Sequence, residues 1–248
     1  VGGGCINEAA RVQTEARVAF VKWSADAPTG MFEIEAAGLR ELAETATIAV
    51  PSVLHQRERS LVMSWVEPSS ARGLAMRDAG HRLATLHERR GHSPGGVRDG
   101  YIGSLKQRNM TSAPMSWLEF FRAHRVESLT SCLPVGLRKR IESLDFEGIL
   151  SEPAGGCALL HGDLWGGNLV CGSDGLGWFV DPAVYYGHPE VDLAMTTLFG
   201  GFSDDFYGAY QEVAGAFDSE MGDRLQLLNV YPLLVHATLF GGGYQVQL

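Results

Sequence analysis

The hydrophobic positions change period along the chain. Residues 17–23 alternate apolar and polar side chains, which is typical of a half-buried strand, and two further strands are predicted at 52–56 and 60–66. Between them, segment 32–46 places apolar residues among Glu, Ala and Arg, a composition that favours a helix. The first part of the chain is therefore predicted to be rich in strands.

After Pro68 the apolar residues recur at helical spacing. Helices are predicted over 75–90, 117–129 and 137–150, followed by a β-rich block at 158–184 and closing helices. The fold class predicted from this order is α+β, with two lobes: a small β-rich lobe at residues 1–66, expected to be truncated at its start, and a larger, mainly α-helical lobe at residues 67–248.

Two segments depart from simple periodicity. Residues 91–114 are rich in Gly, Ser, Asn and Pro and are predicted to form a long loop, a feature that in compact domains is usually functional. Residues 230–244 are strongly apolar but contain Pro232 and a glycine run, well short of the roughly 20 residues of a bilayer span. We predict a buried helix there and no membrane association.

Charge and cysteine content narrow the class of protein. The 20 Lys and Arg residues against 29 Asp and Glu residues give a net charge of −9 with no basic cluster, so no nucleic-acid partner is expected. The four cysteines form no C-x-x-C pair, and no secretion signal is recognisable. Reduced thiols in a cytoplasmic protein are the expectation.

Three polar residues have the spacing of catalytic and metal-binding residues in kinases. Asp163 and Asn168 are five positions apart, as in the kinase catalytic loop H-R-D-L-x-x-x-N, and Asp181 follows an apolar strand where kinases place a metal-binding Asp. Phosphoryl transfer needs an acceptor for a hydroxyl proton and oxygen ligands for Mg²⁺. These three residues can fill those roles.

The N-terminal segment offers a candidate phosphate site. Gly2, Gly3 and Gly4 present backbone amides without side chains, and Lys22 follows near the end of a predicted strand. A glycine run alone is a weak signal. Together with Lys22 and the downstream Asp and Asn residues, it predicts a nucleotide-binding loop.

The combined motifs resemble the fructosamine (ketosamine) kinase family, a branch of the protein-kinase-like fold related to aminoglycoside and choline kinases. The resemblance covers nearly the whole chain. The segments that carry it are Gly3-Gly4-Cys5-Ile6-Asn7-Glu8-Ala9, Asp99-Gly100-Tyr101-Ile102-Gly103, His161-Gly162-Asp163-Leu164-Trp165-Gly166-Gly167-Asn168, Asp181-Pro182-Ala183-Val184-Tyr185-Tyr186-Gly187-His188, Asp192-Leu193-Ala194-Met195 and Leu239-Phe240-Gly241-Gly242-Gly243-Tyr244.

This resemblance implies ATP-dependent phosphorylation of a sugar hydroxyl, classically O3 of a ketosamine, as a step of deglycation repair. It implies Asp163 as the catalytic base, Asn168 and Asp181 as Mg²⁺ ligands, and Lys22 as a phosphate contact paired with Glu35. Because sequence cannot define the register of a helix, Glu33 competes with Glu35 for Lys22.

The resemblance also implies contacts to adenine and acceptor. Backbone groups of Met63, Ser64, Trp65 and Val66 are expected to hold adenine. Trp165 is expected to face the sugar-amine, and His188 and Glu190 are further substrate candidates. His161 and Asp192 are expected to support the catalytic loop.

Two features of the motifs bear on these expectations. Pro189 stands where the family usually has Arg, so any charge role of that Arg is absent. Cys5 lies within the glycine loop, which suggests redox control as a hypothesis.

Other functions remain open from sequence alone. The acceptor could be an aminoglycoside, a choline-like alcohol or a free sugar, and a non-catalytic nucleotide-binding scaffold is a further alternative. The protein is expected to be a monomer or a homodimer.

Overall fold

The computed structural model describes residues 7–15, 17–91, 93–131, 133–241 and 243–244. The predicted phosphate loop at Gly2, Gly3 and Gly4, and Cys5 within it, lie outside the described residues.

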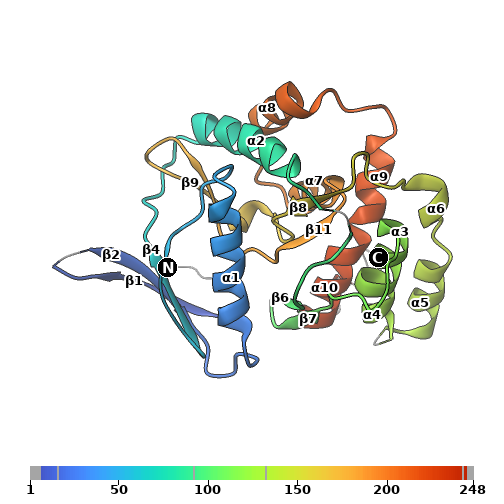
Figure 1. The fold of residues 1–248 in the computed structure, drawn as a ribbon, viewed down its shortest axis with the longest axis horizontal. Coiled ribbons are helices and arrows are strands. Elements are labelled where there is room, and N and C mark those ends of the chain that lie inside the picture. Colours follow the sequence, from blue (N-terminus) through green and yellow to red (C-terminus); the bar gives the residue numbers. More distant parts are fainter. Residues whose placement is uncertain (1–6, 16, 92, 132, 242, 245–248) are drawn as a thin grey trace.

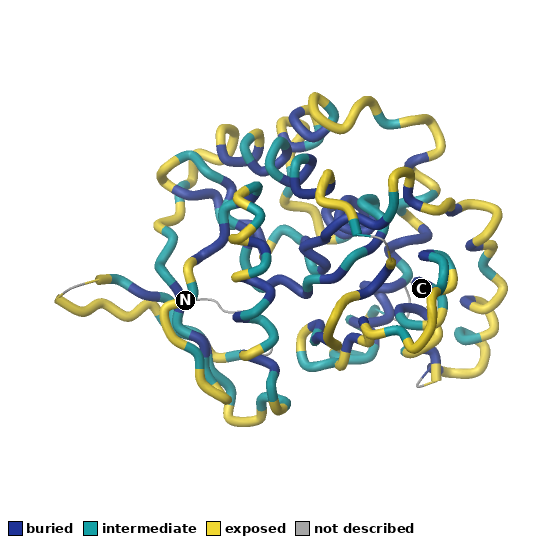
Figure 2. Tube along the Cα trace, viewed as in Figure 1, coloured by how far each residue is buried: buried dark blue, intermediate teal, exposed yellow. Residues whose placement is uncertain are grey.

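A four-stranded antiparallel sheet and one helix form the first lobe (Figure 1). The strands are β1 (Glu8–Gln13), β2 (Val18–Trp23), β3 (Val53–Arg57) and β4 (Ser60–Ser64), in the spatial order β1-β2-β4-β3. The β1–β2 hairpin extends from the body of the molecule, and Figure 2 shows much of β1 as exposed.

Helix α1 (Met31–Glu44) covers this sheet because its apolar residues recur every three or four positions. Phe32, Ala36 and Leu39 are each at most 1% exposed and join Leu61 of β4 in one hydrophobic core. The same packing holds the adjoining side of α1 against β2, where Lys22 lies.

The centre of the second lobe is built from short strands. β8 (Cys157–Leu160) is buried along its whole length and pairs with β5 (Arg90–Gly91) and β11 (Tyr185–Gly187). A second ladder joins β9 (Leu169–Cys171) to β10 (Gly177–Phe179), and the 3₁₀ turn η2 (Gly166–Asn168) precedes it. The segment between β8 and β9 therefore starts and ends on fixed strands.

Helices surround these strands. They are α2 (Gly73–His87), α3 (Trp117–Phe120), the π-helix η1 (Phe121–Glu127), α4 (Ser128–Thr130), α5 (Val135–Glu142), α6 (Phe146–Ile149), α7 (Glu190–Leu198), α8 (Asp204–Ala214), α9 (Met221–Leu228) and α10 (Val230–Phe240). Figure 1 shows α2 and α8 packed together. Gly80 permits this close approach, because a Cβ there would lie 2.2 Å from the carbonyl oxygen of Phe206.

Several predicted helices differ in detail from the observed ones. The helix predicted at 117–129 contains a π-helical stretch, and the one predicted at 137–150 divides into α5 and α6, where the side chain of Asp145 accepts from the amide of Gly148. The apolar segment from Val230 forms α10, which ends before Gly241. No helix among the described residues is both long and apolar enough to cross a membrane.

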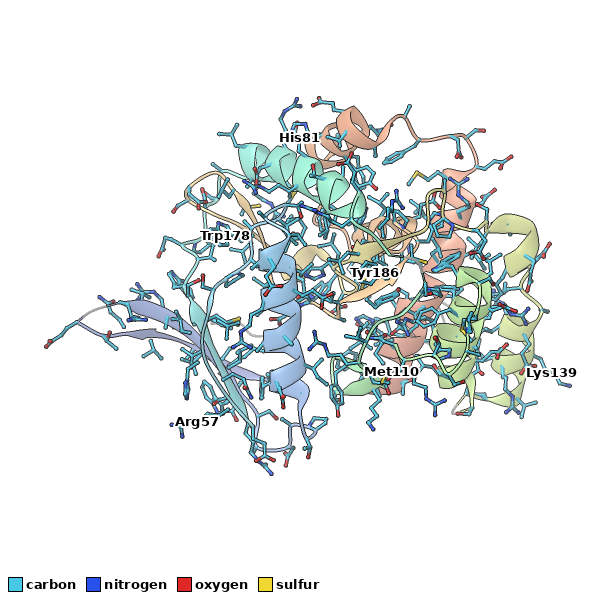
Figure 3. The ribbon with its side chains drawn as sticks, viewed as in Figure 1. Arg57, His81, Met110, Lys139, Trp178 and Tyr186 are labelled. Carbon is cyan, nitrogen blue, oxygen red and sulfur yellow. The ribbon has the colours of Figure 1, made fainter. Side chains whose placement is uncertain are left out.

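The prediction of a loop over 91–114 was wrong in part, because this segment contains a hairpin of β6 (Gly100–Ile102) and β7 (Leu105–Gln107). Gly95 exchanges backbone hydrogen bonds with Tyr186 of β11, which Figure 3 labels near the middle of the molecule. The buried guanidinium of Arg125 donates to the carbonyl of Arg108 and to Oδ1 of Asn109. The segment is therefore held in place at several points.

The expected α+β class with a strand-rich first part and a helical second part is confirmed. The chain leaves β4 at Ser64 and enters α2 at Gly73, so the predicted lobe boundary at residue 66 falls in the connection. That boundary stays a prediction.

Candidate active site

The buried amine of Lys22 joins two carboxylates from distant parts of the chain. Its Nζ lies 2.7 Å from Oε2 of Glu35 on α1 and 3.0 Å from Oδ1 of Asp181 after β10. Lys22 is 4% exposed, whereas Glu33, which lies on α1 with Glu35, faces solvent. The structure thus pairs Lys22 with Glu35 rather than Glu33.

These charges alter one another's proton affinity. Burial alone would lower the pKa of Lys22, but Asp181 and Glu35 together raise it above its ordinary value. Burial raises the pKa of Glu35 to about 7, with Lys22 opposing that rise. The amine is therefore a fixed positive charge at the inner wall of the site.

Asp163 lies in the turn between β8 and η2 and is bound by Asn168. Nδ2 of Asn168 donates to the carbonyl oxygen of Asp163 at 2.8 Å and to its Oδ2 at 3.0 Å. Burial, and next the charge of Asp181, raise the pKa of Asp163 to about 7, while the hydrogen bond from Asn168 opposes the rise. A carboxylate poised near neutrality suits proton transfer.

Asp192 of α7 binds the backbone of this turn. Its Oδ2 accepts from the amide of His161 and its Oδ1 accepts from the amide of Gly162, both at 2.8 Å. Gly162 has φ of 81°, and a Cβ there would lie 2.1 Å from the carbonyl oxygen of Ala183, so the turn requires glycine. These contacts are those expected of Asp192 as a support of the loop.

Two residues that sequence reasoning missed extend this support. Nε2 of His87 lies 3.2 Å from Oδ2 of Asp192, and Nδ1 of His87 lies 2.9 Å from the hydroxyl of Tyr210. His87 ends α2 and Tyr210 lies on α8, so the catalytic turn is tied to that helix pair. The only signal in the sequence was the placement of His87 on an apolar helical face.

A cleft of about 350 Å³ opens over these groups. The ring of Trp165 lines this cleft together with five polar side chains, those of Lys22, Glu35, Asp163, Asn168 and Asp181. Its remaining wall includes Tyr101, Ile102, Phe199, His236, Phe240 and Tyr244, none of which had been assigned a role from sequence. Tyr101, Ile102, Phe240 and Tyr244 did fall within motifs of the family resemblance, which was the available signal.

His188 and Glu190 are not among the residues that line this cleft, so their expected role as substrate residues stays a prediction. Both carboxylate oxygens of Glu190 are bound by Arg224, at 2.8 Å from Nε and 2.6 Å from Nη2. His188 packs against Trp117, and its Nδ1 accepts from the amide of Glu190. Both residues stabilise the start of α7.

The expected adenine segment lies at the end of β4, beside β2. Met63 is 1% exposed and pairs with Phe20 in the sheet, and the ring of Trp65 stacks on that of Phe20 with 6.4 Å between centroids. Phe20 lines the cleft, whereas Met63, Ser64, Trp65 and Val66 do not. An adenine contact there stays a prediction.

Comparison with known proteins agrees with this geometry. The family model for fructosamine kinase matches residues 1–248. The chain belongs to the fructosamine kinase family. The expected relation to this branch of the protein-kinase-like fold is thereby confirmed.

Three relatives illustrate the similarity. A protein named probable ketoamine kinase from Enterococcus faecium is 38% identical, over 100% of this chain and 91% of its own length. A chloroplastic protein-ribulosamine 3-kinase from Oryza sativa subsp. indica is 35% identical, over 99% of this chain and 74% of its own. A crystal structure described provisionally as fructosamine-3-kinase, from Thermobifida fusca, is 34% identical with a TM-score of 0.85, covering 99% of this chain and 88% of that one.

The donor set also fits a divalent cation bound together with phosphates. Among the described residues, no three His, Cys, Asp or Glu side chains converge as a self-sufficient metal site. Mg²⁺ commonly takes only one or two protein ligands and completes its shell with phosphate and water oxygens. Asp181, whose side chain is 39% exposed, and Oδ1 of Asn168 match that requirement.

Proposed function

We propose that this protein transfers the γ-phosphoryl group of ATP to the O3 hydroxyl of a ketosamine. As a member of the fructosamine kinase family it is a phosphotransferase that uses ATP and acts on a hydroxyl group. The observation that carries the proposal is the convergence of Lys22, Asp163, Asn168 and Asp181 on one cleft. The O3 position is the finer part of the proposal.

In this proposal Lys22 contacts the phosphates of ATP. Its ammonium is held by Glu35 on one side and Asp181 on the other, so its position is set before nucleotide binds. Positioning and charge neutralisation supply most of the catalysis of phosphoryl transfer. Glu35 therefore acts by orienting Lys22 rather than by touching the phosphates.

Asn168 and Asp181 would hold Mg²⁺. When bound, this ion neutralises phosphate charge and polarises the transferring group. Asn168 has a second task, because its amide nitrogen orients Asp163 while its oxygen is left for the cation.

Asp163 is the proposed base. It takes the proton of the O3 hydroxyl as the new O3–P bond forms, and the bond from the γ-phosphorus to its bridging oxygen breaks to release ADP. The pKa of Asp163, raised to about 7 by burial, suits this exchange. The resulting O3-phosphate adduct then decomposes, which would make the reaction a repair of glycated amines.

The test is ADP release and product phosphorylation with a panel of ribulosamines, fructosamines, free sugars, choline and aminoglycosides. Turnover of ketosamines that falls by a factor of about 10² to 10⁴ in Asp163→Asn, with ATP affinity retained, is the expected result. Turnover confined to another acceptor would move the substrate class. ATP binding without turnover of any acceptor would favour a non-catalytic scaffold.

Location and assembly are separate from the chemistry. The expected cytoplasmic location, the lack of a nucleic-acid partner and the monomeric or homodimeric state stay predictions. Size-exclusion chromatography with light scattering would settle the last of these.

A further inference from the structure

Aromatic rings from three parts of the chain wall one end of the cleft: the turn that carries Trp165, the residue after α7, and α10 with the residues that follow it. Phe199, which follows α7, lies 4.7 Å from the ring of His236, and the ring of Tyr244 lies 5.1 Å from His236, between centroids. Phe240 lies one helical turn beyond His236, at 5.6 Å. Trp165 of the catalytic turn approaches Phe199 edge-on at 6.1 Å, so the ring cluster reaches the reacting end of the site.

These rings are more exposed than packing residues. Phe199 is 36% exposed and Phe240 is 44% exposed, although both line the cleft. Large apolar side chains that remain accessible inside a concave site are typical of ligand contacts.

His236 has a defined tautomer. Its Nδ1 lies 2.7 Å from the carbonyl oxygen of Pro232, and because a carbonyl oxygen only accepts, Nδ1 carries the proton. Burial lowers the pKa of His236 below its ordinary value, which favours the neutral ring. Nε2 is then an acceptor, and within the described part of the chain it has no hydrogen-bond partner.

The cleft as a whole also carries acidic side chains. Glu35, Asp163 and Asp181 line the cleft, and the amine of Lys22 is already bound by two of them. Aromatic faces attract a cation and accommodate its alkyl substituents, and an unprotonated imidazole nitrogen accepts from an ammonium N–H.

We propose that His236, Phe199, Phe240 and Tyr244 form a subsite for the protonated amine of the ketosamine. The ammonium N–H donates to Nε2 of His236, and the rings contact the charge and the carbon substituent on the amine. This subsite rests on the proposed function, since it assigns the amine half of the acceptor whose sugar half faces Asp163. It makes the enzyme selective for cationic aminoketoses over neutral ketoses of the same shape.

The experiment compares two acceptors that differ only in the group joining C1 to the butyl chain, which is a protonated amine in one and an ether oxygen in the other. One is 1-butylamino-1-deoxyribulose, whose amine is protonated at neutral pH, and the other is the 1-O-butyl ether of ribulose. Wild-type kcat/KM is expected to be at least tenfold higher for the amine. In His236→Phe, which keeps a ring but removes the acceptor nitrogen, KM for the amine is expected to rise about tenfold while KM for the ether and for ATP stays within twofold.

A second variant separates the contribution of the Phe240 ring from that of the His236 nitrogen, and a third variant is the matched control. Tetramethylammonium has no N–H, so its competitive inhibition is expected to weaken in Phe240→Leu and to persist in His236→Phe. His81→Phe is the control, because His81 lies on the outer side of α2, paired with Glu212 and outside the cleft (Figure 3).

The outcomes distinguish the subsite from the function. Equal wild-type kcat/KM for the amine and the ether, or an equal rise in both KM values in His236→Phe, would overturn the subsite while leaving the ketose kinase in place. Failure of the wild type to phosphorylate either acceptor, together with failure on the fructosamines of the acceptor panel, would overturn the proposed function itself.

Discussion

Asn168 donates from a single nitrogen to two oxygens of Asp163, the backbone carbonyl and the side-chain Oδ2. One amide thus holds both the path of the catalytic turn and the orientation of its carboxylate. Asn168 and Asp181 also line the same cleft, so the proposed base and the proposed cation ligands depend on one shared side chain.

Asn168→Ala should therefore damage two steps at once. We expect kcat to fall about 100-fold, in the range known for residues that orient reacting groups, and the Mg²⁺ concentration at half-maximal rate to rise. Steady-state kinetics over a Mg²⁺ titration measures both. An unchanged kcat, in a variant whose circular dichroism matches the wild type, would argue against the dual role.

Glu35→Gln should affect nucleotide use without affecting the acceptor. Gln retains an oxygen that accepts from Lys22 but loses the charge that orients the ammonium, so kcat/KM for ATP is expected to fall 10- to 100-fold. Glu33→Gln is the matched control, because Glu33 lies two positions before Glu35 on α1 and is exposed. This variant should leave kcat/KM for ATP unchanged. A comparable loss in both variants would mean that α1 as a whole, rather than this ion pair, is responsible.

Glu190→Gln should lower stability rather than substrate affinity. The variant loses the ion pair with the largely buried guanidinium of Arg224. We expect this loss to lower the free energy of unfolding by about 1–3 kcal/mol. Urea unfolding measures that cost. KM for a ketosamine should stay within twofold of the wild-type value. A tenfold rise would instead indicate that Glu190 contacts the substrate.

His188 should make stability depend on pH. Burial lowers its pKa to about 4 in the folded protein, against an ordinary histidine pKa of 6.5, so the unfolded chain binds the proton first as pH falls. The contribution of neutral His188 to the free energy of unfolding is complete above pH 6.5 and is lost between pH 6.5 and pH 4. Its upper limit is about 3 kcal/mol. His188→Asn keeps an acceptor for the amide of Glu190 and should remove that part of the slope in urea unfolding measured across this range.

Local patterns in the sequence were enough to predict much of the inner site. Alternation predicted the strand that carries Lys22, helical composition predicted the helix that carries Glu35, and the spacing from Asp163 to Asn168 is short enough to define one turn. Such relations depend on neighbouring residues, so they are readable from sequence.

The rest depends on packing between distant segments. His87 meets Tyr210 across 123 positions, and Phe199 meets His236 only because α10 packs beside the end of α7. The bond between Arg224 and Glu190 could not be predicted, because nothing in the segment around Glu190 reveals Arg224 as its partner. The β6–β7 hairpin was missed because its strands have three residues each, too few to establish a period.

The contact between Lys22 and Asp181 spans 159 positions of the chain. A ribosome exposes the chain from its N-terminus, so the first sheet emerges long before the carboxylate that completes its lysine. Until then, this amine has at most the partner supplied by α1. The cleft that both residues line can consequently be completed only late in synthesis, and a chain interrupted before β10 would carry Lys22 without Asp181.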